Sequence, residues 1–327
     1  MNRFKNILCV LGPVENSHDV LARAVTLAKN NQASLTVIDV IPHVTIGIGI
    51  PMGGPTLPDI QEEIVNSYAH RLSSLIAPYQ EQINIKSKVL LGTPFLSIIR
   101  EVLRQKHDLL VKIPDQQDWL SRFFGSDDMQ LLRKCPCPVW LIKPEAPKSY
   151  RSILAAVDAS ETYHSPDLEI RKLLNQKILQ IASSLAISEF AELHIAHAWD
   201  VMGENAMHHG VFTKTPEAEI SAYVNTAKEQ HSKSLNALLH DVTNAHSDEA
   251  LAYLKPQSHL VKGSARREIP KLAEEIKADL VVMGTVGRIG IPGFIMGNTA
   301  ETILNNIDCS VLAIKPDGFV TPVTLED

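Results

Sequence analysis

The sequence has few aromatic residues, no excess of basic charge and no long apolar run. Phe, Trp and Tyr make up 5% of the 327 residues, and 37 acidic against 31 basic residues leave a formal net charge of −6. Nucleic acids and anionic membranes select basic surfaces, and single strands also select aromatic stacking platforms, so neither partner is expected. No stretch approaches the roughly 20 apolar residues of a membrane helix. Residues 1–14 lack the apolar core and cleavage site of a signal peptide. We therefore expect a cytoplasmic protein.

Cysteine is also scarce, with four residues in the chain. Cys9 and Cys309 lie within apolar runs, whereas Cys135 and Cys137 belong to a Cys-Pro-Cys-Pro segment just before a predicted strand. A structural zinc site needs more ligands at regular spacing. Reduced thiols are thus the favoured interpretation, and no metal site is predicted. The sequence leaves open whether Cys135 and Cys137 respond to oxidants.

The length suggests about two domains of roughly 150 residues each, and an internal repeat supports this division. Four segments recur in the same order: residues 6–11, 91–94, 107–111 and 137–144 match residues 152–157, 262–265, 278–282 and 309–316. Such a repeat must be recognised before the fold is interpreted. We predict a first domain over residues 1–145, a second over 150–318 and a tail over 319–327.

Strand and helix patterns alternate within each half. In the second half the predicted strands are 153–157, 193–198, 259–262, 280–283 and 311–314, and the predicted helices are 166–186, 217–239, 266–276 and 299–306. Continuous apolar strands that alternate with amphipathic helices indicate a parallel sheet covered on both faces. The fold class is therefore α/β in both halves.

A glycine pattern follows the fourth strand of the second half. The strand ends in Gly284, Gly287 comes three residues later, and Gly297 follows after nine more. Asn298 and Glu301 have the spacing of a capping box, which predicts a helix N-terminus with unpaired N–H groups. Glycines and a helix N-terminus at the carboxyl ends of parallel strands favour a phosphate-binding loop. The alternative is that the glycines only form tight turns.

Asp158 closes the first strand of the second half and borders the same predicted crevice. Its carboxylate can accept a hydrogen bond from an adenine amine or a ribose hydroxyl, or hold Mg²⁺. The alternative is that Asp158 caps the following turn through Ser160. Both interpretations stay open.

Two loops interrupt the pattern. Residues 42–58 are rich in Gly and Pro, and the corresponding segment 200–216 carries His208 and His209. A vicinal His pair can bind a metal, but no carboxylate or cysteine stands at ligand spacing nearby. An exposed, variable loop is the favoured interpretation of both segments.

At these residues the sequence resembles the universal stress protein family. The resemblance rests on the Gly-x2-Gly-x9-Gly pattern, an Asp closing the first strand and a last strand ending in Ile-Lys-Pro, and it covers both halves. Residues 284–290, 297–301 and 131–136 resemble the tandem, E-type members. The resemblance implies a five-stranded parallel sandwich in each half, of the adenine nucleotide alpha hydrolase-like type. Asn298 departs from the Ser or Thr that is usual there.

The resemblance also implies a ligand, a site and an arrangement of the two halves. The ligand is ATP, with or without Mg²⁺, and the nucleotide-binding residues are Asp158, Ala198, Met283, Gly284, Gly287, Arg288, Gly297, Asn298 and Thr299. Strands 139–142 and 311–314 would pair within one molecule as a pseudo-dimer, and a homodimer is a further arrangement. The function implied is a stress-response sensor or regulator that binds an adenine nucleotide.

Two other functions remain open. One is a weak ATPase or an enzyme of phosphate or adenylate transfer, although the glycine loop has no lysine and the sequence shows no clear base. The other is a scaffold that binds a small apolar or metal ligand through the loops at 42–58 and 200–216, without a nucleotide.

The first half has lost the pattern. Gly12, Ile113 and Gln116 occupy the places of Asp158, Gly284 and Gly287. Asp127 and Asp128 fall in the first turn of the following helix, where two carboxylates already satisfy the helix dipole. They would repel a phosphate at a cost of about 4 kcal/mol for two charges 4 Å apart at an effective dielectric constant of 20. We predict that this half does not bind ATP and either binds an apolar ligand or supports the second half.

Overall fold

The computed structural model describes residues 4–12, 17–45, 56–114, 126–161, 165–201, 203–208, 216–245, 254–285 and 296–325. The elements of the first half are β1 (Asn6–Val10), α1 (Ser17–Asn31), β2 (Ser34–Ile41), α2 (Leu57–Ile76), the 3-10 turn Ala77–Tyr79, β3 (Ile85–Leu91), α3 (Pro94–Gln105), β4 (Leu109–Lys112), α4 (Asp127–Lys134) and β5 (Val139–Leu141). Strands and helices therefore alternate, as the hydrophobic pattern predicts.

The second half repeats this order. Its elements are β6 (Ser152–Ala156), α5 (Ser165–Glu189), β7 (Glu192–Trp199), α6 (Glu204–His208), α7 (Glu217–Ala245), β8 (Gln257–Lys262), α9 (Ala265–Glu275), β9 (Leu280–Gly284), α10 (Asn298–Leu304) and β10 (Ser310–Ile314). The main differences from the predicted elements are the longer α7 and the short helix α6. The latter lies in a segment predicted to be a loop, so that prediction was wrong for Glu204–His208.

The strands of the described residues form one continuous sheet in the order β3-β2-β1-β4-β5-β10-β9-β6-β7-β8. Neighbouring strands are parallel except for β5 and β10, which pair antiparallel with Trp140 opposite Leu312. The two halves are thus related by an approximate two-fold axis near these two residues. The predicted pairing of segments 139–142 and 311–314 within one molecule is present.

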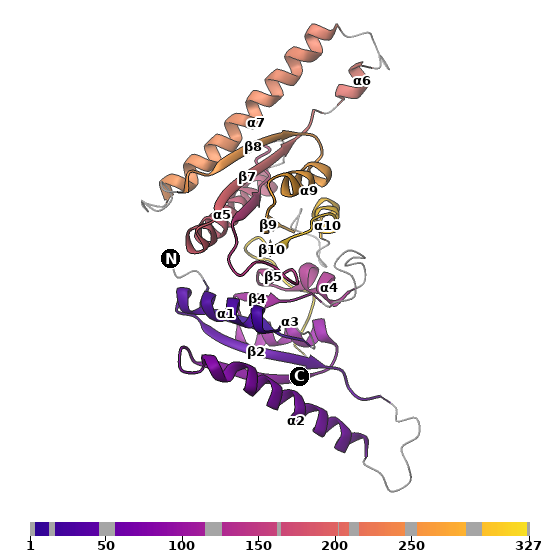
Figure 1. Cartoon of the computed structure of the whole chain (residues 1–327). Coiled ribbons are helices and arrows are strands. Elements are labelled where there is room, and N and C mark those ends of the chain that lie inside the picture. Colours follow the sequence, from indigo (N-terminus) through magenta and orange to yellow (C-terminus); the bar gives the residue numbers. More distant parts are fainter. Residues whose placement is uncertain are drawn as a thin grey trace.

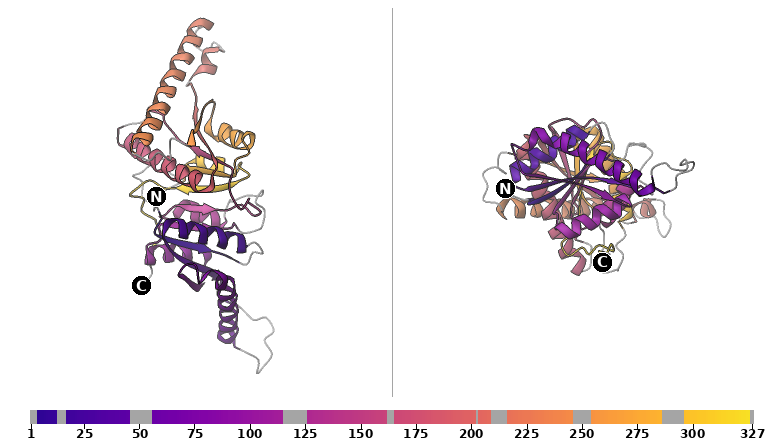
Figure 2. Two further views of the ribbon diagram at one scale, coloured as in Figure 1. Left: turned by 60° about the vertical axis from the view of Figure 1, so that its left-hand side comes forward. Right: turned by 90° about the horizontal axis from the view of Figure 1, so that it is seen from below.

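Helices cover both faces of the sheet, and each hydrophobic core runs through both halves. On one face α1, α2, α5 and α7 pack against the strands, and on the other face α3, α4, α9 and α10 do so. Figure 1 shows the halves end to end, with α7 at one end of the molecule and α2 at the other. Figure 2 shows the twist of the strands as a fan when the molecule is viewed along its length.

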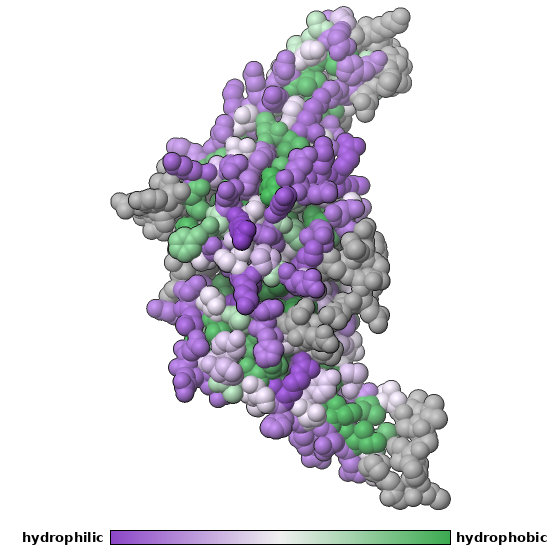
Figure 3. All heavy atoms as spheres, in the orientation of Figure 1, coloured by the Kyte–Doolittle hydropathy of each residue, from purple (hydrophilic) through white to green (hydrophobic). Residues whose placement is uncertain are grey.

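The outer surface is consistent with the acidic, polar composition. On the face seen in Figure 3, hydrophilic residues predominate and hydrophobic residues appear in small patches between them. No helix in the described part of the chain is long and apolar enough to cross a membrane.

Candidate functional site

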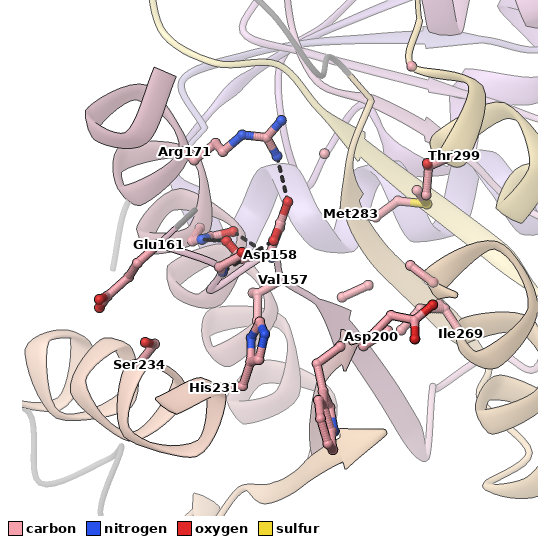
Figure 4. A pocket seen from close by; sticks show the side chains of 18 of the residues that line it. Val157, Asp158, Glu161, Arg171, Asp200, His231, Ser234, Ile269, Met283 and Thr299 are labelled. Atoms are coloured by element: carbon pink, nitrogen blue, oxygen red, sulfur yellow. Dashed lines mark hydrogen bonds and ion pairs between the residues drawn. The ribbon is translucent and has the colours of Figure 1, made fainter. Parts of the chain in front are cut away.

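A cavity of about 620 Å³ opens at the carboxyl ends of β6, β7 and β9, beside the start of α10 (Figure 4). This is the edge of a parallel sheet at which α/β proteins bind ligands. Six of the nine predicted site residues line it: Asp158, Ala198, Met283, Gly284, Gly297 and Thr299. Asn298 is exposed and is not among the residues that line the cavity. Gly287 and Arg288 lie outside the described residues.

Asp158 makes both a turn contact and an ion pair. Its Oδ1 accepts a hydrogen bond from the Ser160 N–H at 3.3 Å, as the turn-capping interpretation predicts. Its Oδ2 lies 2.6 Å from Nη1 of Arg171 on α5, and Figure 4 shows the guanidinium reaching toward the carboxylate. A ligand at this strand end therefore meets an Asp–Arg pair. Arg171 is not among the residues predicted from the sequence, because helical spacing alone does not show which turn of α5 crosses the strand end.

Gly284 is required by packing against α5. A Cβ atom at this position would lie 2.7 Å from Cδ2 of Leu174, far inside van der Waals contact. Glycine lets β9 and α5 approach each other closely, so the absence of a side chain at position 284 serves the helix–sheet contact. The next residue, Thr285, is buried, lines the cavity and has no hydrogen-bond partner for its Oγ1 among the described residues.

The helix after the glycine segment begins one residue earlier than the predicted capping box would require. Gly297 is the N-cap of α10 and Asn298 is its first residue, with no side chain capping the N-terminus. The predicted capping box is therefore wrong. Glu301 instead forms an ion pair with Arg133 of α4 at 2.8 Å, because the β5–β10 pairing brings α4 and α10 together. Among the described residues, no side chain caps the first N–H groups of α10.

Two histidines connect the centre of β7 to α7 beside the cavity. The backbone N–H of Ala159 donates to Nδ1 of His197 at 3.3 Å, and Nε2 of His197 lies 2.9 Å from Nδ1 of His231. The same Nδ1 also lies 3.4 Å from the carbonyl oxygen of Val157, so the tautomer of His197 sets which ring nitrogen of the histidine pair donates. His231 also lines the cavity.

Burial keeps this pair neutral. It lowers the pKa of His197 and of His231, while the Asp158 carboxylate opposes the shift in both. Trp199, at the end of β7, packs beside His231 with ring centroids 5.8 Å apart. Its Nε1 is buried, and no described residue accepts a hydrogen bond from it. The sequence analysis missed these three residues, although His197 and Trp199 alternate with the predicted Ala198.

The first half carries a different polar set at the corresponding strand ends. Strands β2 and β7 have the same length and burial pattern, which places Asp39 at the position of His197. Asp39 is fully buried, burial raises its pKa, and Arg71 of α2 approaches its Oδ2 at 3.9 Å. The Arg71 guanidinium also donates to the carbonyl of Gly12, which stands in the place of Asp158. An arginine thus lies over this strand end.

The predicted repulsion in the first half needs a correction. Asp128 is buried and pairs with Lys112 of β4 at 2.9 Å, so its charge is compensated by a cation. The side chain of Ser126 accepts a hydrogen bond from the Met129 N–H and caps α4. The helix N-terminus is therefore occupied by a cap, whereas the N-terminus of α10 has none.

Comparison with known proteins agrees with this geometry. The model of the universal stress protein family matches residues 3–143 and again residues 171–315. The chain belongs to the universal stress protein family. It is 30% identical over 334 residues to universal stress protein E of Photorhabdus laumondii, covering 99% of this chain and 98% of that protein. The identity to universal stress protein E of Escherichia coli K12 is also 30%, over 100% and 99% of the two chains.

A solved structure supports the same fold. A universal stress protein from Archaeoglobus fulgidus superposes with a TM-score of 0.58 at 18% identity, covering 94% of this chain and 98% of the other. The family assignment and the full-length relatives support a role in the stress response.

Proposed function

We propose that the second half binds an adenine nucleotide, ATP with or without Mg²⁺, in the cavity at the ends of β6, β7 and β9. The protein would act in the cytoplasm as a stress-response sensor or regulator. The observation that carries the proposal is the cavity itself, lined by six residues of the site that the family resemblance implies. Its volume of about 620 Å³ falls within the roughly 300–1,000 Å³ of small-molecule sites.

The polar groups of the cavity suit a ligand rich in hydrogen-bond acceptors. Trp199 Nε1 is buried without a described partner, and the imidazole of His231 lines the cavity beside it. The Thr285 hydroxyl is likewise buried without a described partner. Leaving a buried donor unpaired costs about 1–3 kcal/mol. The ring nitrogens of adenine and the oxygens of ribose and phosphate are acceptors that would remove this cost.

The same residues favour binding over catalysis. Phosphoryl transfer needs a positioned nucleophile and cations that stabilise the developing charge. Among the described residues that line the cavity, Arg171 is the one permanent cation, and Asp158 holds its guanidinium. A Mg²⁺ ion on Asp158 would compete with the 2.6 Å ion pair. We therefore expect turnover to be slow compared with the release of bound nucleotide.

Calorimetric titration of the full chain with ATP and Mg²⁺ tests the proposal. Trp199→Phe and Thr285→Val each remove one donor while keeping nearly the same shape. Each should weaken binding by about 3–10-fold, the equivalent of a hydrogen bond worth roughly 0.5–1.5 kcal/mol. Trp140→Phe is the matched control, because Trp140 is also buried but lies far along the sheet, on β5. Gly284→Val is unsuitable because its side chain would collide with Leu174.

The outcomes separate the alternatives. Absence of binding at millimolar ATP would overturn the proposal and favour a scaffold. Binding with rapid ATP hydrolysis that is abolished by Asp158→Asn would favour an enzyme. Equal weakening in Trp199→Phe and Trp140→Phe would show that the nucleotide lies elsewhere.

A further inference from the structure

A buried lysine lies where the two halves of the sheet meet. Lys315 follows β10, is 1% exposed, and donates through Nζ to the Leu132 carbonyl at 2.5 Å. Its Nζ also lies 5.3 Å from the ring centroid of Phe319. Within the described residues no carboxylate pairs with it. A buried ammonium is costly unless an opposite charge compensates it. A nearby group that can become anionic would therefore stabilise the charged form of Lys315.

The approximate two-fold axis supplies an internal comparison. Because Trp140 pairs with Leu312, Lys143 is the counterpart of Lys315. Lys143 has an ordinary partner, the Asp308 carboxylate at 2.7 Å. The counterpart of Asp308 in the repeat is the proline between Cys135 and Cys137. In place of the carboxylate, Lys315 therefore has a proline flanked by two thiols, with which its ammonium interacts electrostatically.

The two thiols are in contact with each other. Sγ of Cys135 and Sγ of Cys137 lie 3.5 Å apart, and the side chains are 0% and 6% exposed. Burial raises the pKa of Cys135, but the hydrogen bond from Cys137 and the Lys315 ammonium outweigh burial and leave this pKa below its ordinary value. The pKa of Cys137 is raised, because it holds the shared proton, is buried and lies near the Asp108 carboxylate.

The pKa of Lys315 reflects the same interaction. Burial lowers the pKa of Lys315 to about 8, while the two sulfur atoms oppose the shift. The first proton is therefore lost from the thiol pair as a unit, and the Lys315 ammonium compensates the resulting negative charge. A thiolate beside an ammonium is the form of cysteine that reacts with oxidants.

A cleft leads to one of the two thiols. Cys137 lines a cleft of about 720 Å³ between the halves. Val102 and Lys106 border this cleft from α3, and Leu173 and Lys177 border it from α5. Cys9 and Cys309 offer a contrast, because burial raises both of their pKa values and neither lines this cleft.

We propose that Cys135, Cys137 and Lys315 form an oxidant-sensitive dithiol site that a hydroperoxide converts to a Cys135–Cys137 disulfide. The thiolate of the pair attacks one peroxide oxygen, the O–O bond breaks, and a sulfenic acid and hydroxide form. The second thiol attacks the sulfenic sulfur, the S–O bond breaks, and the disulfide forms with loss of water. The Lys315 ammonium protonates the hydroxide to a second water. Two sulfur atoms are oxidised and the two peroxide oxygens are reduced.

The full chain, treated with hydrogen peroxide, then unfolded and alkylated, tests this reaction by peptide mass spectrometry. The peptide with Cys135 and Cys137 should lose two hydrogens and resist alkylation, while Cys9 and Cys309 should stay alkylatable. Cys137→Ser should abolish the disulfide. Lys315→Met should slow the reaction by about tenfold or more, since each unit of raised pKa removes about 90% of the thiolate. The matched control Lys143→Met should react as the wild type does.

A measurement on the wild type guards against a variant that fails to fold. The rate of alkylation of the Cys135–Cys137 pair should rise with pH with a midpoint below the roughly 8.5 of an ordinary thiol. A midpoint at or above that value would overturn the proposal. So would oxidation of Cys135 and Cys137 no faster than that of Cys9 and Cys309, or an equal rate in Lys315→Met and Lys143→Met.

Discussion

Nε2 of His197 and Nδ1 of His231 share a hydrogen bond of 2.9 Å that joins β7 to α7 beside the cavity. The contact has no equivalent in the first half, where Asp39 stands at the position of His197. A second His–His contact, Nδ1 of His194 to Nε2 of His259 at 2.9 Å, links β7 to β8. Each of these bonds needs at least one neutral ring, so both depend on pH.

Stability should fall as the pH drops below neutrality. Burial lowers the pKa of His194, His197, His231 and His259 below the ordinary value of 6.5. The unfolded chain therefore binds more protons, and the stabilisation is present above pH 6.5 and lost as the pH falls through the lower folded-state pKa values. Urea unfolding between pH 7.5 and pH 5 measures this loss.

The matched variant for this prediction is the double change His197→Gln and His231→Gln. Its free energy of unfolding should depend less steeply on pH than that of the wild type over the same range. Identical slopes would show that this pair does not titrate as its burial implies.

A methyl group at Gly284 should destabilise the second half. Gly284→Ala would place Cβ 2.7 Å from Cδ2 of Leu174, and an overpacked core typically costs about 1–3 kcal/mol. Leu174→Ala alone should also destabilise, because Leu174 is buried. The double variant should cost less than the sum of the single changes, since the smaller side chain at 174 removes the collision. Strict additivity in urea unfolding would contradict the packing account.

The buried pair of Lys112 and Asp128 should respond asymmetrically to substitution. Removing one partner leaves an uncompensated buried charge, so Asp128→Asn or Lys112→Met should cost about 3–5 kcal/mol. Replacing both, with Lys112→Met and Asp128→Leu, should cost much less, because no buried charge remains. Urea unfolding of the three variants distinguishes this account from one in which the pair is solvent-screened and each change costs under about 1 kcal/mol.

Much of the fold could be predicted because the repeat is visible in the sequence. The apolar run at 280–284 forms a strand parallel to β10, and its counterpart at 109–112 forms a strand parallel to β5. The last strands of the two halves, β5 and β10, pair antiparallel. These features depend on local hydrophobic pattern and on symmetry, which residue order alone displays. The cavity at the strand ends follows from the same topology.

The side chains that complete the site could not be predicted in the same way. Arg171 and His231 come from the long helices α5 and α7, and their place depends on where each helix crosses the sheet. Asn298 was misplaced by one residue because its expected partner, Glu301, binds Arg133 from the other half. The charge of Asp128 was misjudged because its partner Lys112 is brought in by β4. Contacts across the fold decide each of these cases.

The stoichiometry of ATP binding to the full chain tests the central claim, that only the second half binds nucleotide. Calorimetric titration of the wild type should give one site per chain, and a variant with Trp199→Phe and Thr285→Val should weaken that site by about 10–100-fold if the two hydrogen bonds add. Two sites per chain, or one site with unchanged affinity in the variant, would contradict the claim.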